Sequence, residues 1–375
     1  MRIYILGICV FIFCFSCKTR KTENLQTPIE YRQESVPTKN PKNIILLIGD
    51  GMGMGQISAG TYRNGDKSNL ERFDVTGIHK PSCYNKLITD SAAGATAFAC
   101  GEKTYYQAVG VDKDTLPMQT ILEEAELKNL ATGLVATSTI VHATPASFIA
   151  HNASRRNYEA IATDFLKTDI EYFVGGGNKF FERRETDERN LVEEFNAKGY
   201  HMGNYLTDFS DFKKSIPSKG KVGFLTADES PLPVAQGRDY FIDASMTGIE
   251  FLKRQDGDGF FIMIESSQID WGGHANDSEY ILSEFLEFNK LIGQVLDWAE
   301  KDGETLVVLT ADHETGGYTI HQESTLDSLV TVFTSKNHSG DFIPVFAHGP
   351  QAELFTGLYE NTEIYHRMRK AIGWK

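Results

Sequence analysis

Short apolar runs alternate with longer segments of helical pattern from Asn43 towards the C-terminus. The runs are rich in Ile, Val, Leu and Phe, which is typical of strands that are buried on both faces. Buried strands that alternate with helices predict an α/β fold with a mainly parallel central β-sheet sandwiched between helices. The predicted strands are Ile44–Ile48, Gly133–Thr137, Tyr172–Val174, Val222–Leu225, Phe260–Ile264, Leu306–Leu309 and Ile343–Ala347.

Two helices have clear signatures. One is predicted from Ser278 to Glu300, because apolar residues recur there at helical spacing and Asp302-Gly303 can end the helix. Another is predicted at Met118–Lys128, ahead of the strand that starts at Gly133. The apolar face of the first helix contains Tyr280, Phe285, Phe288, Leu291, Ile292, Val295 and Leu296.

The N-terminus has a different pattern. Ile3–Phe15 is almost wholly apolar, and Ser16-Cys17 then precedes a basic stretch. A run this short suits the apolar region of a secretory signal better than a span of the bilayer. A small residue directly before a cysteine resembles the lipobox of bacterial lipoproteins. We therefore predict a signal peptide over residues 1–16, with a lipobox that ends at Cys17.

This interpretation divides the chain into three parts. The signal peptide is followed by a polar tether over residues 17–42, and residues 43–375 form a single domain. The mature protein is expected to be exported to the periplasm or cell envelope and held at the membrane through lipid on Cys17. An uncleaved membrane anchor is the alternative, and it also places the domain outside the cytoplasm.

Composition excludes several classes of protein. The 375-residue chain has 37 Lys and Arg against 51 Asp and Glu, so its formal net charge is 37 − 51 = −14. Hydrophobic residues make up 41% and charged residues 23%, which excludes a collagen-like, disordered or many-pass membrane protein. The excess of acids argues against nucleic-acid binding, which needs a broad positive face. Beyond the signal peptide and Cys17, the remaining cysteines are Cys83 and Cys100, which either pair or stay free.

Side chains that can bind metals follow several of the predicted strands. In open α/β sheets the ligand lies beyond the carboxyl ends of the strands. Carboxylates, imidazoles and hydroxyls that gather there suit metal ions. The residues in such positions are Asp50, His142, Thr144, Glu265, Asp312 and His313.

The first of these residues lies in a glycine-rich loop, Gly49–Gly55. The glycine spacing does not fit a dinucleotide-binding loop, and Asp50 would repel a pyrophosphate. A carboxylate among glycines suits a metal ligand that needs close approach of the backbone. A tight turn with a capping Asp is the alternative.

Asp90-Ser91 precedes a run of small helix-forming residues. A serine at a helix N-terminus directs its hydroxyl towards the positive end of the helix dipole, which favours an alkoxide or a bound phosphate. The motif lacks the GxSxG pattern of a hydrolase elbow. When the motif is read alone, an ordinary Asp or Ser cap explains it better.

Further candidates follow in the second half of the chain. Asp270 and His274 are four residues apart, so one helical turn would place both on one side. Trp271 between them can be a packing residue. His338 precedes the last predicted strand, and Arg155 or Arg156 could hold a phosphate through two parallel hydrogen bonds. The histidines without such a pattern are taken as ordinary polar or packing residues: His79, His151, His201, His321, His348 and His366.

Together, and in this order from about Asn43 to Gly349, these motifs resemble those of the alkaline phosphatase family. The resemblance implies that Ser91 is the nucleophile, that Arg155 holds the phosphate and that Asp90 orients Arg155. It implies two Zn²⁺ and one Mg²⁺. The implied ligands are Asp270, His274 and His338 for the first zinc, Asp50, Asp312 and His313 for the second, and Asp50, Thr144 and Glu265 for the magnesium.

The sequence departs from the family pattern at two positions. His142 and Trp271 stand where the best-known bacterial enzyme has Asp and Lys, near the third metal and the phosphate. We expect both to contact the substrate, and they leave the identity of the third ion open. The stretch between His313 and His338 is too short for the crown domain of the animal enzymes, so a homodimer, which the resemblance allows, cannot be built through that insertion.

The function implied by the resemblance is hydrolysis of small phosphate monoesters to alcohol and phosphate through a phosphoserine. One alternative is a phosphodiesterase of the same superfamily, with the same metals and a wider pocket. A sulfatase would need a C/S-x-P-x-R signature around Ser91, which this sequence lacks. The alternative from a different class is a non-catalytic lipoprotein that binds phosphate or metal.

Overall fold

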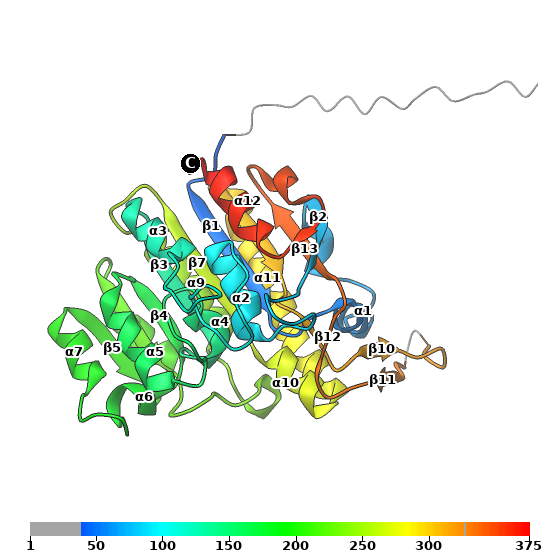
Figure 1. Ribbon diagram of the computed structural model, residues 1–375, viewed down its shortest axis with the longest axis horizontal. Coiled ribbons are helices and arrows are strands. Elements are labelled where there is room, and N and C mark those ends of the chain that lie inside the picture. Colours follow the sequence, from blue (N-terminus) through cyan, green and yellow to red (C-terminus); the bar gives the residue numbers. More distant parts are fainter. Residues whose placement is uncertain (1–38, 326–327) are drawn as a thin grey trace, which may run out of the picture. The chain divides into compact units, whose positions relative to one another are not determined.

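Strand β1 (Asn43–Gly49) lies inside a ten-stranded sheet, with β8 on one side and β7 on the other, both parallel to it. The computed structural model describes residues 39–325 and 328–375 (Figure 1). In sheet order the strands are β14 (Gly357–Glu360), β2 (Val75–Lys80), β13 (Ile343–His348), β8 (Thr305–Thr310), β1, β7 (Phe260–Ser266), β3 (Ala131–Thr139), β4 (Tyr172–Gly176), β6 (Lys221–Leu225) and β5 (Tyr200–Asn204).

All seven predicted strands are present, and the mainly parallel α/β fold is confirmed. The exception to the parallel arrangement is β13, which is antiparallel to both β8 and β2. The sheet also contains β2, β5 and β14, which the sequence analysis did not predict. β14 is an edge strand with exposed positions, β5 is an edge strand with one buried and four half-buried residues, and β2 alternates buried and exposed residues. None of them therefore has the continuous apolar run of a central strand.

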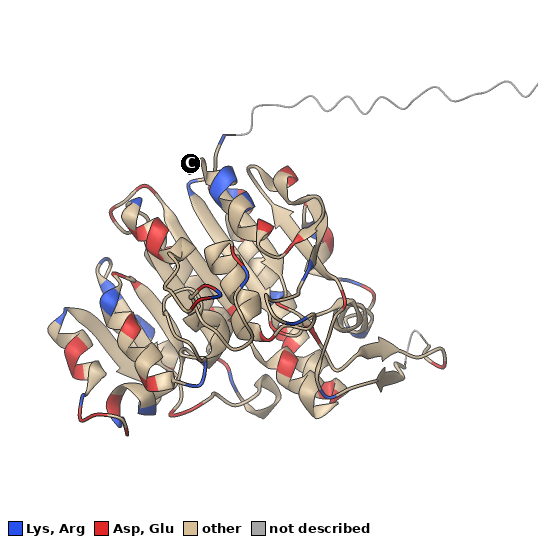
Figure 2. Cartoon of the chain, in the orientation of Figure 1, with Lys and Arg blue, Asp and Glu red and all other residues tan. Residues whose placement is uncertain are grey.

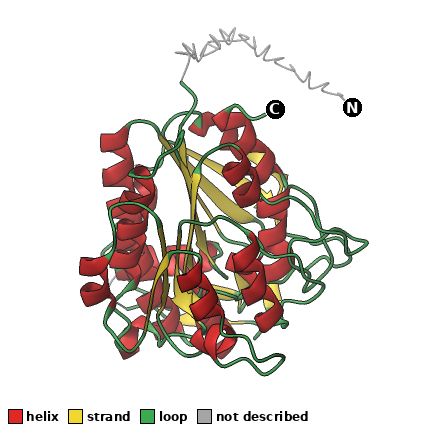
Figure 3. Ribbon diagram, turned by 90° about the vertical axis from the view of Figure 1, so that its left-hand side faces the viewer, coloured by secondary structure: helices red, strands yellow, loops and turns green. Residues whose placement is uncertain are grey.

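Both faces of the sheet are buried. Ile44, Leu46 and Ile48 of β1 belong to one apolar core, whereas Ile45 and Leu47 belong to the other. Successive side chains of a strand point to opposite faces, so a central strand needs apolar residues at every position. Figure 3 shows helices on both sides of the sheet.

The first core is covered by helices α2 to α7 and α12, and the second by α1, α8, α9, α10 and α11. The helices are α1 (Met54–Arg63), α2 (Ser91–Cys100), α3 (Ile121–Leu127), α4 (Ala143–Ala146), α5 (Tyr158–Asp164), α6 (Asn178–Glu182), α7 (Leu191–Ala197), α8 (Phe209–Phe212), α9 (Phe241–Lys253), α10 (Gln268–Ala275), α11 (Ser278–Asp302) and α12 (Glu363–Ile372). Two short ribbons complete the described part: β9 (Glu314–Thr315) with β12 (His338–Ser339), and β10 (Tyr318–Ile320) with β11 (Thr331–Phe333).

The predicted helix at Ser278 is confirmed as α11. Asp277 caps its N-terminus by accepting a hydrogen bond from the Tyr280 amide, and Gly303 ends it in the left-handed conformation. The other predicted helix is shorter than expected: α3 begins at Ile121, because Thr120 and Glu123 form a reciprocal capping box there.

Cys83 and Cys100 are buried free thiols, so they do not pair. Charged residues of both signs are interspersed over the helices and loops (Figure 2). None of the helices in the described ranges combines the length and apolar character needed to cross a membrane. The predicted signal peptide, Cys17 and almost all of the predicted tether lie outside the described residues.

Candidate active site

The carboxyl edge of the central strands gathers the predicted ligands. Asp50 directly follows β1, Glu265 lies near the end of β7, and Asp312 and His313 follow β8. All four side chains are buried. Since β1, β7 and β8 are adjacent and parallel, their carboxyl ends meet at the same edge of the sheet, as the sequence analysis expected.

His338 reaches this edge from a different direction. It lies in β12, ahead of β13, and β13 runs antiparallel to β8. The chain that leads into β13 therefore lies at the same edge of the sheet as the carboxyl end of β8. Pairing of His338 with Thr315 in the β9–β12 ribbon fixes its position beside His313, and the two imidazole rings stack with centroids 3.5 Å apart.

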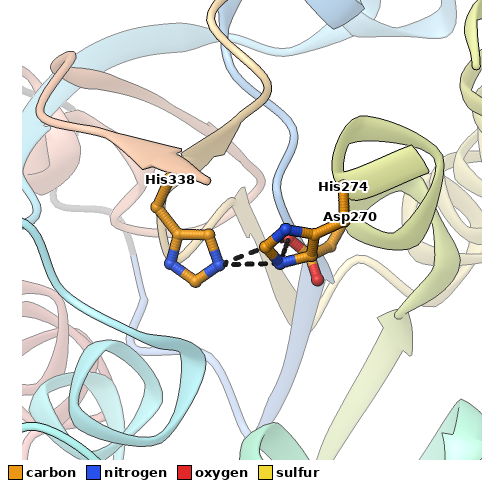
Figure 4. A group of neighbouring side chains, drawn as sticks. All are labelled: Asp270, His274 and His338. Atoms are coloured by element: carbon orange, nitrogen blue, oxygen red, sulfur yellow. Dashed lines mark hydrogen bonds and ion pairs between the residues drawn. The ribbon is translucent and has the colours of Figure 1, made fainter. Parts of the chain in front are cut away.

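The first ligand group consists of Asp270, His274 and His338 (Figure 4). Asp270 and His274 lie one turn apart on α10, as predicted from their spacing. His274 Nδ1 is 2.6 Å from the Lys336 carbonyl oxygen, and His338 Nδ1 is 2.9 Å from the Thr89 carbonyl oxygen. Carbonyl oxygens only accept, so both Nδ1 atoms carry the proton and both Nε2 atoms present lone pairs.

These two Nε2 atoms are 3.2 Å apart, and Asp270 Oδ1 lies 3.4 Å from one and 3.6 Å from the other. Burial and the charge of His313 lower the pKa of His338 to about 4, which keeps its ring neutral. Two lone pairs and a carboxylate that converge repel one another unless a cation lies between them. This donor set of two imidazoles and one carboxylate fits zinc.

The second group is centred on Asp50. Both of its carboxylate oxygens are buried without a hydrogen-bond partner, and burial, followed by the charges of Asp312 and Asp270, raises its pKa well above its ordinary value. His313 Nε2 lies 3.5 Å from Asp50 Oδ1 and 3.1 Å from Asp312 Oδ2. Asp270 also reaches this group. A buried carboxylate with unpaired oxygens beside a second carboxylate requires positive charge.

The loop that carries Asp50 depends on Gly51. Its φ is +72°, and a Cβ there would lie 2.6 Å from the Asp270 Cα atom. The glycine therefore allows the backbone to approach α10 closely. Its amide donates to Asp312 Oδ1 at 3.2 Å, which positions that carboxylate.

The third group contains Asp50, Glu265 and His142, whose ligand atoms lie within 4.8 Å of one another. Burial raises the pKa of Glu265 to about 7. Burial, with the charge of Arg155 second, lowers the pKa of His142 to about 3, so its ring is neutral. Thr144 Oγ1 and Glu265 Oε1 are buried without a hydrogen-bond partner, as is His142 Nδ1. The oxygen donors suit magnesium. His142 Nε2 accepts from Arg155, so the neutral ring carries its proton on Nδ1 and lies beside this group without adding a ligand nitrogen.

Ser91 is the first residue of α2, and Asp90 is its N-cap. The capping interpretation is confirmed for Asp90: its Oδ1 accepts from the Ala93 amide at 3.3 Å, while Oδ2 accepts from Arg155 Nη1 at 3.0 Å. Ser91 Oγ lies 3.3 Å from His313 Nε2, which places the hydroxyl directly against the second ligand group.

A pocket of about 340 Å³ opens above these groups. Arg155 is part of its wall and donates through Nη2 to His142 Nε2 at 3.1 Å. Trp271 also lines the pocket and packs edge-on against His142, with ring centroids 6.0 Å apart. The complete lining is Asp90, Ser91, Tyr106, Gln107, His142, Arg155, Arg156, Tyr158, Asp270, Trp271, His274 and His338. The structure thus brings every predicted site residue to this pocket or to the ligand groups beneath it.

Other contributors were missed. Tyr106, Gln107 and Tyr158 line the pocket, although no sequence motif marks them. His79, which was taken as an ordinary residue, contacts the Ala311 carbonyl oxygen through Nε2 at 2.9 Å, just before Asp312. Thr315 bonds to Asp270, and its position two residues after His313 is the signal that could have identified it.

The comparisons with known proteins agree with this site. The family model described as alkaline phosphatase matches residues 41–332 and 328–374. Alkaline phosphatase 3 of Bacillus subtilis is 34% identical, with 88% of this chain and 89% of the relative aligned. Alkaline phosphatase of Escherichia coli is 30% identical, over 92% of this chain and 88% of the relative. The solved structure of alkaline phosphatase from the Antarctic bacterium TAB5 is 43% identical, has a TM-score of 0.85, and aligns over 90% of this chain and 99% of its own.

These matches span nearly the whole described fold, including the sheet that positions the site. The protein is therefore a metal-dependent hydrolase of phosphate esters. More narrowly, the chain belongs to the alkaline phosphatase family and is a phosphoric monoester hydrolase.

Proposed function

We propose that the protein hydrolyses small phosphate monoesters through a phosphoserine on Ser91, at a site that holds two Zn²⁺ and one Mg²⁺. One observation carries this proposal: three groups of ligand atoms, several of them buried without a hydrogen-bond partner, converge beside a serine and an arginine. Asp270, His274 and His338 would hold the first zinc. Asp50, Asp312 and His313 would hold the second, and Asp50, Thr144 and Glu265, with His142 beside them, the magnesium.

When bound, these ions supply Lewis acidity and positive charge for the serine hydroxyl, the phosphate oxygens and the leaving alcohol. Ser91 Oγ gives up its proton to solvent and attacks phosphorus; the Oγ–P bond forms as the bond from phosphorus to the ester oxygen breaks, and the ester oxygen takes up a proton from solvent and leaves as the alcohol. Water then cleaves the Oγ–P bond, which restores Ser91 and releases phosphate. The buried position of Ser91 at the α2 N-terminus fixes its hydroxyl for in-line attack.

Arg155 binds the phosphate. Burial acts to lower its pKa, but the charge of Asp90, the hydrogen bond to Asp90 and the charge of Asp50 together raise it, so the guanidinium stays charged. Asp90 holds one edge of the guanidinium and the neutral ring of His142 accepts from another nitrogen. Held on both sides, Arg155 can direct its remaining N–H groups at the oxygens of the transferred phosphoryl group.

Substitution of Ser91 tests this mechanism. The Ser91→Ala variant should lose most turnover of 4-nitrophenyl phosphate and keep its zinc content, since Ser91 is not in any of the ligand groups. Ser283→Ala is the control, because the Ser283 hydroxyl bonds to the Tyr280 carbonyl oxygen on α11, away from the site. Wild-type turnover by Ser91→Ala would refute the phosphoserine. Faster hydrolysis of bis(4-nitrophenyl) phosphate than of the monoester would instead identify a phosphodiesterase.

The cellular location is part of the same proposal. The apolar run Ile3–Phe15 and the Ser16-Cys17 pair support export and lipid attachment at Cys17, which would place the catalytic domain at the cell envelope. Full-length chain expressed with radiolabelled palmitate should incorporate label and enter the membrane fraction. The Cys17→Ala variant should do neither, and equal labelling of both chains would refute the lipid anchor.

A further inference from the structure

A second hollow of about 710 Å³ lies next to the catalytic pocket. The two share two lining residues, Arg156 and Tyr158. The Tyr158 ring packs against Phe180 with centroids 4.9 Å apart, which steadies it as a wall between the two hollows. A substrate whose phosphate is held by Arg155 therefore has room for the rest of its structure beyond Arg156.

The backbone presents two consecutive arginines in different ways. Asn152 Oδ1 accepts from the Ser154 amide at 3.1 Å and from Asn157 Nδ2 at 2.7 Å, which ties the turn closed. The Arg155 amide donates to the Gln107 carbonyl oxygen at 2.8 Å. This turn directs Arg155 inward to Asp90 and leaves Arg156 exposed at the pocket rim.

Arg156 differs from the other cations around the two hollows. Arg155 pairs with Asp90, Lys167 with Asp164, Arg184 with Asp187 and Arg189 with Glu194. Within the described part of the chain, Arg156 has no carboxylate partner. A guanidinium at the rim of an anion-binding pocket can bind an anionic ligand when its N–H groups are not paired with a carboxylate.

We infer that Arg156 is a specificity-determining residue, and that the preferred substrates are phosphate monoesters whose alcohol part carries a second anionic group, a carboxylate or another phosphate. This inference rests on the proposed monoesterase function. Arg155 holds the phosphate that is transferred, and Arg156 binds the second anion where the pocket continues into the adjacent hollow. Because this contact forms in the ground state as well as in the transition state, it acts mainly on KM.

Three alkyl substrates of similar leaving-group basicity test this inference: butyl phosphate, 4-phosphooxybutanoate and butane-1,4-diyl bisphosphate. For the metal-loaded wild-type enzyme we expect kcat/KM on at least one of the two doubly anionic substrates to exceed that on butyl phosphate by about two- to fivefold, within the range of an exposed charge pair. The preference should fall at high ionic strength. Comparison of the two doubly anionic substrates shows whether a carboxylate or a second phosphate is recognised.

The Arg156→Gln variant should bring this ratio close to one through a higher KM for the doubly anionic substrates, and Arg156→Lys should retain part of it. Lys86→Gln is the matched control: Lys86 lies over the Tyr106 ring, 3.7 Å from its centroid, and lines neither hollow. It removes a nearby positive charge and should keep the ratio.

The outcomes separate the two claims. If wild type hydrolyses butyl phosphate but shows no preference for a second anion, the inference about Arg156 is wrong and the proposed function stands. The inference about Arg156 is also overturned if Arg156→Gln keeps the preference for doubly anionic substrates, or if Lys86→Gln reduces this preference as much as Arg156→Gln does. If butyl phosphate and 4-nitrophenyl phosphate are both inert, the monoesterase proposal fails and the inference fails with it.

Discussion

The Thr315 hydroxyl donates a hydrogen bond to Asp270 Oδ1 and lies 3.2 Å from His313 Nδ1. A hydroxyl has one proton, and Thr315 donates it in the hydrogen bond to Asp270. In the second contact the Thr315 oxygen must therefore accept, and His313 Nδ1 is the donor. His313 then presents Nε2 to Ser91 and Asp50. Thr315 also pairs through its backbone with His338. One threonine thus positions ligands from both proposed zinc sites.

We predict that Thr315→Val weakens zinc binding about 10- to 100-fold, as loss of a partner behind metal ligands commonly does. Valine keeps the shape of threonine and removes its hydrogen bonds. Zinc titration of EDTA-treated enzyme, followed by 4-nitrophenyl phosphate hydrolysis, measures the effect. Thr315→Ser keeps the hydroxyl and should reload like wild type. Equal zinc requirements for Thr315→Val and wild type would show that the hydroxyl does not position these ligands.

Asp90 combines a helix cap with a charge partner, and its variants should separate the two roles. Asp90→Ala leaves the Ala93 and Gln107 amides and the half-buried Arg155 without their acceptor. We expect it to reduce the free energy of unfolding by about 3–5 kcal/mol, as when one member of a buried ion pair is removed. Asp90→Asn keeps an oxygen for the two amides and should cost clearly less. Urea denaturation of both variants measures the difference, and equal losses would show that the cap contributes little.

The fold could be predicted because its central strands are buried on both sides. β1, β7 and β8 have apolar residues at nearly every position, so their patterns stand out from the amphipathic helices around them. Asp50 follows β1 directly and Asp312 follows β8 after one residue, and the rule that parallel strands end at one edge was enough to bring them together. Asp270 and His274 could also be predicted to lie together, because their four-residue spacing is one helical turn.

Other features depend on contacts that no local pattern contains. The sequence analysis gave no direction for β13, and it is the antiparallel direction that delivers His338 to the site. His142 was expected to contact substrate, but the structure also groups it with Asp50 and Glu265, because β3 ends beside β7. Tyr106 and Tyr158 line the pocket from a loop and from the short helix α5, and Thr315 lies in the two-residue strand β9, so no periodic pattern marks these residues.

His142 provides a test of the third metal site. His142→Asp would add a carboxylate to Asp50 and Glu265, and oxygen ligands favour magnesium. We predict tighter Mg²⁺ binding by calorimetry. His142→Asn, which is similar in size and uncharged, should bind Mg²⁺ more weakly than His142→Asp. Tighter Mg²⁺ binding by His142→Asn than by His142→Asp would show that the third ion does not bind beside His142.

Glu126 at the end of α3 should make stability fall as pH rises. Burial raises its pKa to about 7 from an ordinary value of 4.5; the Asp169 amide opposes the rise and the charge of Glu171 adds to it. Between these two values the unfolded chain has released the proton while the folded protein retains it. The folded state then binds more protons, so the free energy of unfolding decreases with pH through this window.

Glu126→Gln should remove this decrease, because glutamine stays neutral and its carbonyl oxygen can still accept from the Asp169 amide or the Thr132 hydroxyl. We expect the Tm of the variant to rise relative to wild type as pH increases from about 5 to about 8. Differential scanning calorimetry at several pH values measures this difference, and metal-site titrations cancel because both proteins share them. Glu188→Gln, at an exposed position, is the control and should follow wild type. A Tm difference between Glu126→Gln and wild type that stays constant over this range would show that Glu126 does not titrate differently in the folded state.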